Sequence, residues 1–218
     1  MMESPLFEDL PWLRHGFGNK NILLDHYLVS EKIQTIVLQT KQIHGAVVHS
    51  LHRDEKKCLK GDAFITDQSG VVCFVRTADC VPILVADPEH HAVAAVHAGW
   101  RGTAAEVLQA TLQKMQQQWG SRPSVLRVAI GPAIGPCCYQ VGRDVQQALE
   151  KWCVPDGIKR WRLDLKEANR QSVENFGVPS TQIDILKGCT CCEPEKWSSY
   201  RREGNKRGEQ VSFIYGVE

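Results

Sequence analysis

Short apolar segments of strand length follow one another through the first half of the chain, and they constrain its fold more than any other feature. Each is rich in β-branched residues, and most are bounded by Gly, Asp or Pro, which is typical of strands and the turns between them. The expected strands cover residues 34–40, 46–50, 62–66, 70–77, 81–87 and 91–98. Pro82 has no N–H to donate, so we expect its strand to lie at a sheet edge or to begin there.

Helices alternate with strands in the second half. Two helices open on a capping box, one formed by Thr103 and Glu106, the other by Asp164 and Glu167. The expected helices cover residues 103–120, 143–152 and 164–177. The expected strands cover residues 124–130, 181–187 and 210–216. This order predicts an α/β (α+β) fold, in which a single layered domain over residues 1–218 has mixed sheets flanked by helices.

Charge and hydropathy limit the partners of the chain. Its 26 Lys and Arg residues nearly balance its 25 Asp and Glu residues, for a net charge of +1. A balance of this kind gives no field that recruits nucleic acid or an anionic membrane. No apolar run approaches the length of a spanning helix, and the acidic N-terminal segment has no signal-peptide core. We expect a cytoplasmic monomer that acts on a small-molecule substrate.

Three segments combine glycine-rich turns with reactive side chains. They are Lys41–Gly45, Thr77–Cys80 and His97–Gly102, and each lies at the end of a predicted element. Layered sheets place their functional groups at such ends. We therefore expect the active site to form where these segments meet.

Two chemistries fit the reactive residues of these segments. Cys80, His97 and His44 match the ligands of a catalytic zinc site with an open fourth position. Their long spacing excludes a zinc finger, whose ligands arrive in close pairs. Alternatively, Cys80 is a nucleophile and His97 its base, with Asp79 or Asp62 orienting the imidazole. Spacing does not separate these alternatives, because both need a deprotonated sulfur beside an imidazole.

The remaining motifs are less specific. The nine cysteines follow no export signal, so we expect metal or nucleophilic use of one or two rather than a disulfide framework. Cys189 and Cys192 form a C-x-x-C without a second pair at zinc-finger spacing, and we do not expect Cys137 and Cys138 to join it. Two Gly-Pro steps predict a stiff loop over 131–139. The basic segment 200–207 suits either a bound phosphate or a solvated face.

Taken together, six segments resemble the YfiH/laccase-domain family, also called the multicopper polyphenol oxidase or purine nucleoside phosphorylase family. They are QIHG (42–45), GDAFIT (61–66), TADCVPILVAD (77–87), HAVAAVHAGWRG (91–102), GPAIGPCCYQVG (131–142) and SYRREG (199–204). The resemblance implies a layered fold similar to that of the cytotoxic necrotising factor toxins. It also implies zinc held by His44, Cys80 and His97, with copper as a possible substitute.

The family resemblance implies several activities. The first is phosphorolysis of purine nucleosides, including methylthioadenosine, together with adenosine deamination. The second is an amidase that corrects a peptidoglycan precursor carrying serine. The third is a copper-dependent laccase, which is disfavoured because multicopper clusters need more histidines than eight scattered ones without H-x-H pairs.

For the nucleoside reactions we assign provisional roles to individual residues. His44, Cys80 and His97 would be catalytic, and zinc among them would activate the attacking group. Arg101 and Arg201 would bind phosphate, and Gln42 would hydrogen-bond the sugar or base. Asp62 would contact the substrate and, with Asp79 as the alternative, carry a proton. The H-x-E and P-C-x-x-C signature of the familiar zinc deaminases is absent.

Overall fold

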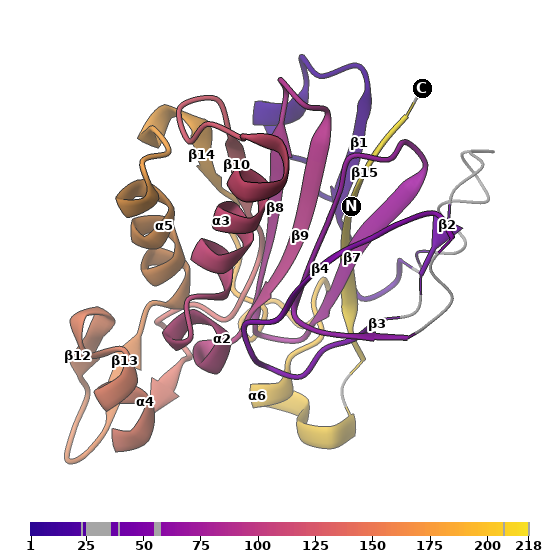
Figure 1. Ribbon diagram of the computed structural model, residues 1–218. Helices are drawn as coiled ribbons and strands as arrows, with labels where there is room; N and C mark the ends of the chain where they lie inside the picture. Colours follow the sequence, from indigo (N-terminus) through magenta and orange to yellow (C-terminus); the bar gives the residue numbers. More distant parts are fainter. Residues whose placement is uncertain (23, 25–35, 39, 55–57, 207, 218) are drawn as a thin grey trace.

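Two β-sheets packed face to face form the centre of the molecule, and two helices cover the outer face of the larger sheet (Figure 1). The computed structural model describes residues 1–218 except 23, 25–35, 39, 55–57, 207 and 218. The helices that cover the sheet are α3 (Val107–Trp119) and α5 (Leu165–Phe176). The layered α/β fold expected from the order of elements is therefore confirmed.

The larger sheet has six strands, of which the inner four are antiparallel and the two outer pairings parallel. Their order is β14 (Ile183–Ile185), β10 (Arg127–Ile130), β8 (Val81–Asp87), β9 (Ala92–Ala98), β6 (Ala63–Thr66) and β4 (Val48–Ser50). Alternate side chains of β8 enter different cores. Ile83 and Val85 pack toward the helices, whereas Leu84 and Ala86 pack toward the second sheet. Burial on both faces explains the unbroken apolar run.

The smaller main sheet has four strands. Their order is β1 (Leu13–Phe17), β15 (Gln210–Gly216), β7 (Val71–Thr77) and β2 (Ile36–Val37). Strand β1 was not expected, because its sequence LRHGF lacks β-branched residues and alternation. The strand expected over 34–40 becomes β2 and the separate β3 (Thr40–Lys41), and residues 34, 35 and 39 lie outside the described part.

Smaller elements surround these layers. Strand β3 pairs with β5 (Leu59–Lys60), and a three-stranded sheet contains β11 (Gln140–Val141), β13 (Trp161–Leu163) and β12 (Cys153–Pro155). The short helices are α2 (Trp100–Ala104), α4 (Arg143–Ala148) and α6 (Tyr200–Glu203), with 3-10 turns at Pro5–Phe7, Glu150–Trp152, Ser180–Gln182 and Gly204–Lys206. The helix expected over 143–152 is thus α4 followed by a 3-10 turn.

The helix expected to begin at Thr103 is wrong in its start and its continuity. The chain enters α2 at Trp100, leaves it at Ala104 and begins α3 only at Val107. Glu106 between them is left-handed, with φ of 60°, which interrupts a right-handed helix. The Thr103 hydroxyl accepts a hydrogen bond from Asn169 at 3.0 Å instead of capping a helix.

The helix at Asp164 follows its capping signal. The Asp164 side chain accepts a hydrogen bond from the Glu167 N–H at 3.0 Å, and Gly177 ends the helix with a left-handed backbone. Pro82, in contrast, lies in the second position of a central strand, so the edge alternative is wrong and the strand-beginning alternative holds. Its carbonyl accepts a hydrogen bond from the N–H of Gly131, one residue beyond the end of β10. The N–H that Pro82 lacks is therefore not required for pairing with β10, which has already ended there.

Candidate metal and active site

Cys80 and His97 come together through the pairing of β8 and β9. Pro82 lies opposite His97 in this antiparallel pair, and Cys80 immediately precedes β8. Gly99 follows β9 beside them, and a Cβ at that position would lie 3.0 Å from the Cys80 sulfur. The absence of a side chain at Gly99 therefore gives the Cys80 thiol its space.

His44 reaches the same place from a loop that Asp62 holds. The buried Asp62 carboxylate accepts hydrogen bonds from the backbone N–H groups of Ile43, His44 and Gly45 at 3.3, 2.9 and 2.7 Å. His44 has a left-handed backbone with φ of 58°, a conformation that this set of hydrogen bonds maintains. The donor atoms of His44, Cys80 and His97 all lie within 4.8 Å of one another.

Asp62 also orients His97. Its carboxylate accepts from Nδ1 of the buried His97 ring at 2.8 Å, which leaves Nε2 for the side of Cys80. Burial raises the pKa of Asp62, but the hydrogen bonds from His97 and the Gly45 backbone outweigh it and hold the pKa below its usual value. Of the two carboxylates considered from sequence, Asp62 contacts the imidazole. The substrate contact assigned to Asp62 stays a prediction, and its surroundings favour a positioning role.

The thiol and the imidazole shift each other's protonation. Burial raises the pKa of Cys80, but hydrogen bonds from His44 and His97 lower it to about 7. Burial lowers the pKa of His97, but hydrogen bonds with Asp62 and Cys80 raise it to about 9. The pair therefore favours a thiolate beside an imidazolium near neutral pH. The His44 and His97 rings meet edge to face, with centroids 4.8 Å apart.

This donor set fits a transition-metal ion. One sulfur and two ring nitrogens are the ligands of catalytic zinc sites that retain an open position. The carboxylate behind His97 is the outer-shell partner that fixes the tautomer of a metal-bound histidine. His44, Cys80 and His97 could therefore hold a metal.

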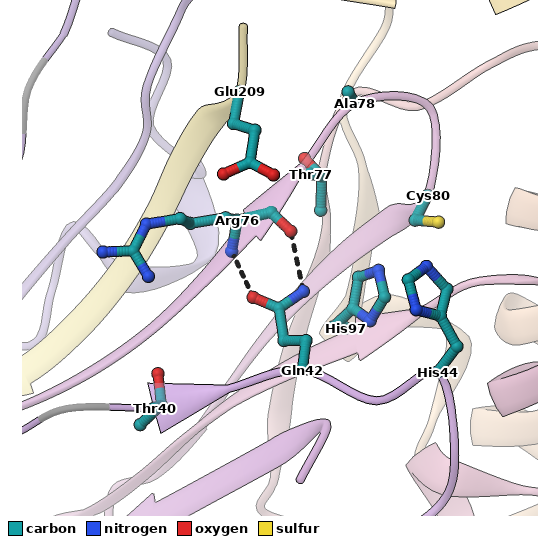
Figure 2. Close-up of a pocket in the computed structure, with 9 residues that line it drawn as sticks. All are labelled: Thr40, Gln42, His44, Arg76, Thr77, Ala78, Cys80, His97 and Glu209. Atoms are coloured by element: carbon teal, nitrogen blue, oxygen red, sulfur yellow. Dashed lines mark hydrogen bonds between the residues drawn. The ribbon is translucent and has the colours of Figure 1, made fainter. Parts of the chain in front are cut away.

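Two cavities meet at the triad. The first, of about 320 Å³, is also lined by Thr40, Gln42, Arg76, Thr77 and Glu209 (Figure 2). The second, of about 520 Å³, is lined by aromatic and cationic residues, including Trp100, Tyr139 and Arg201. Both include His44 and Cys80 in their walls. A substrate with two chemically different halves could therefore reach the triad from both sides.

Gln42 lines the first cavity, but the backbone of Arg76 occupies its amide. Gln42 donates to the Arg76 carbonyl and accepts from the Arg76 N–H, each at 2.8 Å (Figure 2). These bonds tie the loop before His44 to the end of β7. A direct contact between Gln42 and the substrate stays a prediction.

Arg101 and Arg201 both line the second cavity. The Arg101 guanidinium lies over the Trp100 ring, 4.2 Å from its centroid. That of Arg201 lies 5.4 Å from the Tyr139 centroid and donates to the Gln140 carbonyl at 2.8 Å. Both cations are therefore held against an aromatic residue on the same side of the triad.

Sequence reasoning missed the parts played by Tyr139 and Asp79. Burial and the charge of Cys80 raise the pKa of Tyr139, so its hydroxyl stays protonated in the cavity wall. Asp79 lies away from the imidazoles and accepts from the Thr190 hydroxyl at 2.6 Å and the Arg201 N–H at 2.7 Å. In the sequence, the only sign of a role for Asp79 was its position directly before Cys80. That position did not predict its contacts with Thr190 and Arg201.

Fold and site together define a layered α/β protein with a group of two histidines and one cysteine that could hold a metal ion. The chain belongs to the family described as multi-copper polyphenol oxidoreductase laccase, whose model matches residues 18–216. The resemblance noted from the six motifs is thereby confirmed.

Relatives and solved structures support the same placement. The chain is 34% identical over 210 residues to a purine nucleoside phosphorylase from Bacteroides thetaiotaomicron, covering 90% of this chain and 78% of the relative. It is 34% identical over 191 residues to adenosine deaminase RL5 from an unknown prokaryotic organism, covering 81% and 72%. The crystal structure of Bacillus licheniformis hypothetical protein YfiH matches with a TM-score of 0.87 and 29% identity, covering 97% of this chain and 95% of that one.

In the part of the chain that the structure describes, every helix is too short or too polar to span a bilayer.

Proposed function

We propose that the chain is a zinc-dependent purine nucleoside phosphorylase that also deaminates adenosine and cleaves methylthioadenosine. The observation that carries the proposal is the position of the triad, where the second cavity, walled by aromatic residues and cations, meets the more polar first cavity. The relatives named as purine nucleoside phosphorylases and as an adenosine deaminase support the same class of substrate.

His44, Cys80 and His97 would hold the zinc ion. When bound, zinc would supply Lewis acidity and lower the pKa of a coordinated water. Asp62 would keep the proton of His97 on Nδ1, so that Nε2 presents a lone pair to the metal. Cys80 would bind as the thiolate, a form that its lowered pKa already favours.

The cations would serve phosphorolysis. Arg101 and Arg201 would bind inorganic phosphate, because guanidinium groups pair with phosphate through parallel hydrogen bonds. A phosphate oxygen would then attack C1′ of the sugar, and the bond from C1′ to the purine nitrogen would break. The base would leave with the bonding electron pair and take up a proton. Tyr139 stays protonated in this wall and would donate a hydrogen bond to the substrate.

Product analysis tests this proposal. The protein is purified without added metal and incubated with adenosine, with and without phosphate. We expect adenine and ribose 1-phosphate only when phosphate is present, and inosine and ammonia in both cases. His97→Ala should abolish both reactions and lose one equivalent of zinc. His52→Ala, which removes an exposed histidine bonded to Gln68 away from the triad, should change neither.

Amide hydrolysis is the second candidate function, and the Cys80–His97 pair favours it. A thiol with a pKa of about 7 beside an imidazole is the arrangement of cysteine hydrolases. In this case a precursor that joins muramic acid to alanine or serine would be cleaved without nucleoside turnover. Retention of hydrolysis after zinc removal would assign the reaction to Cys80 itself.

A copper oxidase has weaker support. Copper binds nitrogen and sulfur ligands more tightly than zinc does, so an excess of copper would enter the same triad. Among the described residues, however, the group at this site offers two histidines, fewer than a multicopper cluster requires. Phenol oxidation that appears only after copper loading would therefore reflect substitution at the zinc site.

A further inference from the structure

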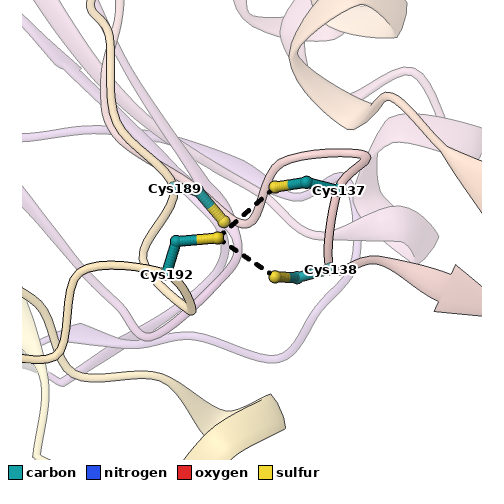
Figure 3. A group of neighbouring side chains, drawn as sticks. All are labelled: Cys137, Cys138, Cys189 and Cys192. Atoms are coloured by element: carbon teal, nitrogen blue, oxygen red, sulfur yellow. Dashed lines mark hydrogen bonds between the residues drawn. The ribbon is translucent and has the colours of Figure 1, made fainter.

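Four cysteine thiols gather outside the triad, on two loops far apart in the sequence. Cys137 and Cys138 come from the loop after β10, whereas Cys189 and Cys192 come from the loop after β14 (Figure 3). All four sulfurs lie within 4.8 Å of one another. The expectation that the C-x-x-C would remain separate from Cys137 and Cys138 is therefore wrong.

Backbone pairing between the loops explains why the sulfurs meet. Ala133 forms a parallel β-bridge with Cys189, and the Thr190 N–H donates to the Ala133 carbonyl. The Gly135 N–H donates to the Cys189 sulfur at 3.2 Å. Cys192 then folds back, donating its N–H to the Cys189 carbonyl at 3.1 Å, which directs both C-x-x-C sulfurs toward the other pair. Because each of these hydrogen bonds is donated by a backbone N–H, the backbone of the two loops itself holds the four sulfurs close together.

Two of the sulfur separations are close to those of a tetrahedral zinc site. With Zn–S bonds of about 2.3 Å, the sulfurs of a four-thiolate site lie about 3.8 Å apart. The Cys192 sulfur lies 3.6 Å from that of Cys137 and 3.3 Å from that of Cys138. A four-iron cluster would separate the sulfurs further, because each thiolate would bind a different iron atom. The spacing therefore suits a single ion.

Disulfide bonds account for the cluster less well. All nine cysteines are free thiols in the structure. Cys137 and Cys138 are neighbours, and their Cα atoms, about 3.8 Å apart across a trans peptide, are too close for ordinary disulfide geometry. One bond between the loops would use one sulfur of each pair and leave two thiols facing it, so two bonds would have to form side by side to use all four. A single ion uses all four.

The surroundings suit the charge of a thiolate site. Two guanidinium groups donate to carbonyls of cluster residues, Arg162 to Cys137 and Arg201 to Cys138, and a third, Arg202, donates to the carbonyl of Cys191 inside the C-x-x-C. Four thiolates around a divalent cation leave a net charge of −2, which these cations would offset.

We propose that Cys137, Cys138, Cys189 and Cys192 bind one structural zinc ion in a closed four-thiolate site, separate from the triad. Four protein ligands leave no open position, so the ion would stabilise structure and take no part in chemistry. It would join the loop that leads to Tyr139 of the second cavity to the segment that leads into α6, whose Tyr200 and Arg201 line the same cavity. Tyr139 follows Cys138 directly, and Arg201 contacts the Cys138 carbonyl, so loss of the ion would loosen the substrate wall.

Zinc counting by elemental mass spectrometry tests the proposal. Wild-type protein prepared without added metal should contain two zinc ions per chain if the triad also binds zinc, and one if it does not. In either case, the double variant Cys138→Ser/Cys192→Ser should contain one zinc ion fewer. His97→Ala should retain the cluster ion, and X-ray absorption on that variant should show four sulfurs at about 2.3 Å from zinc and no nitrogen.

A matched control and a second measurement keep the result interpretable. Cys58→Ser/Cys153→Ser removes two cysteines that belong to neither group and should leave the zinc content unchanged. If the cluster variant does not fold, wild-type protein is alkylated before and after chelation and its peptides are mapped. The four cluster cysteines should be protected until zinc is removed, whereas the exposed Cys58 should be labelled in both samples.

Three results would overturn the proposal. The first is an unchanged zinc content in a folded cluster variant. The second is a wild-type protein that contains no zinc and whose four cluster cysteines are alkylated before any chelator is added. The third is iron in place of zinc. Failure of the nucleoside assay would bear only on the triad, because the zinc count of the cluster is read independently of turnover.

Discussion

The Asp62 carboxylate lies 2.8 Å from Nδ1 of His97 and also accepts three backbone N–H groups from the loop that carries His44. One buried side chain thereby positions two of the three candidate metal ligands. It connects the start of β6, the end of β9 and the turn after β3. Any change at Asp62 should consequently affect the whole site.

Asp62→Asn should weaken zinc binding at the triad by about 10- to 100-fold, the range found when an outer-shell carboxylate of a metal-binding histidine is lost. The negative charge disappears, and the amide cannot accept from every present donor. Competition with a chromogenic chelator would measure the affinity. Asp67→Asn is the matched control, because Asp67 is exposed and accepts from the Trp119 ring N–H at 3.0 Å rather than from a residue of the triad. Equal affinity in wild type and Asp62→Asn would contradict the positioning role.

Gly99→Ala should impair the triad with little effect on the fold. The added Cβ would lie 3.0 Å from the Cys80 sulfur and 3.4 Å from Cδ2 of His44, so both donors must move. We expect the zinc affinity and turnover to fall by about tenfold or more, since small displacements in a site are costly. Gly45→Ala serves as the control, because its nearest contacts would be ordinary ones at 3.8 Å. Similar losses in both variants would show that crowding of the Cys80 sulfur by the added Cβ is not the cause.

The metal-free Cys80 thiol should react as a thiolate at neutral pH. Its alkylation rate should rise through a pKa of about 7, below the value near 8.5 of an unperturbed cysteine. His97→Ala should move this transition to higher pH, because a hydrogen bond to the thiolate is lost. Iodoacetamide labelling followed by peptide mapping at a series of pH values measures both. A transition in the wild type that stays near 8.5 would contradict the proposed coupling.

Asp79→Asn should alter substrate binding without removing zinc. Asp79 holds the Thr190 hydroxyl with one oxygen and the Arg201 N–H with the other, whereas an amide would turn a donor toward one of them. We expect a higher KM for phosphate and about 1 to 3 kcal/mol less stability, because a buried polar group loses its partner. Steady-state kinetics, zinc content and urea unfolding would separate these effects. Loss of zinc with an unchanged KM for phosphate would contradict this prediction.

His15 should make the fold sensitive to acid. Burial lowers its pKa to about 4, and its Nε2 accepts from the Ser4 N–H at 2.8 Å. Because the folded pKa lies below the unfolded value of about 6.5, this contribution is present above pH 6.5 and is lost as the pH falls toward 4. The wild type should lose about 2 kcal/mol more than His15→Gln between pH 7 and pH 5. Parallel urea titrations would show no such difference if His15 were readily protonated.

Sequence patterns predicted the central strands well. The runs at 81–87 and 91–98 are apolar almost throughout because both faces of these strands are buried. The helix after Asp164 followed its capping signal for a local reason, because cap and helix are contiguous. Thr103 and Glu106 carried the same signal and did not form the cap. The contact of Thr103 with Asn169 and the tight approach of Gly102 to the Gly45 carbonyl, which a Cβ would meet at 3.1 Å, are tertiary.

Sequence motifs alone were enough to assign the family, the layered fold and the three candidate metal ligands, because these depend on local patterning and on motifs that keep their order along the chain. The role of each aspartate depends on the folded chain, because Asp79 directly precedes Cys80 in sequence, yet it is Asp62 that contacts His97, whereas Asp79 accepts from Thr190. The four-cysteine cluster likewise forms only in the folded chain. Its two pairs lie on separate loops, and a β-bridge between Ala133 and Cys189, invisible to spacing, brings their sulfurs within reach of one ion.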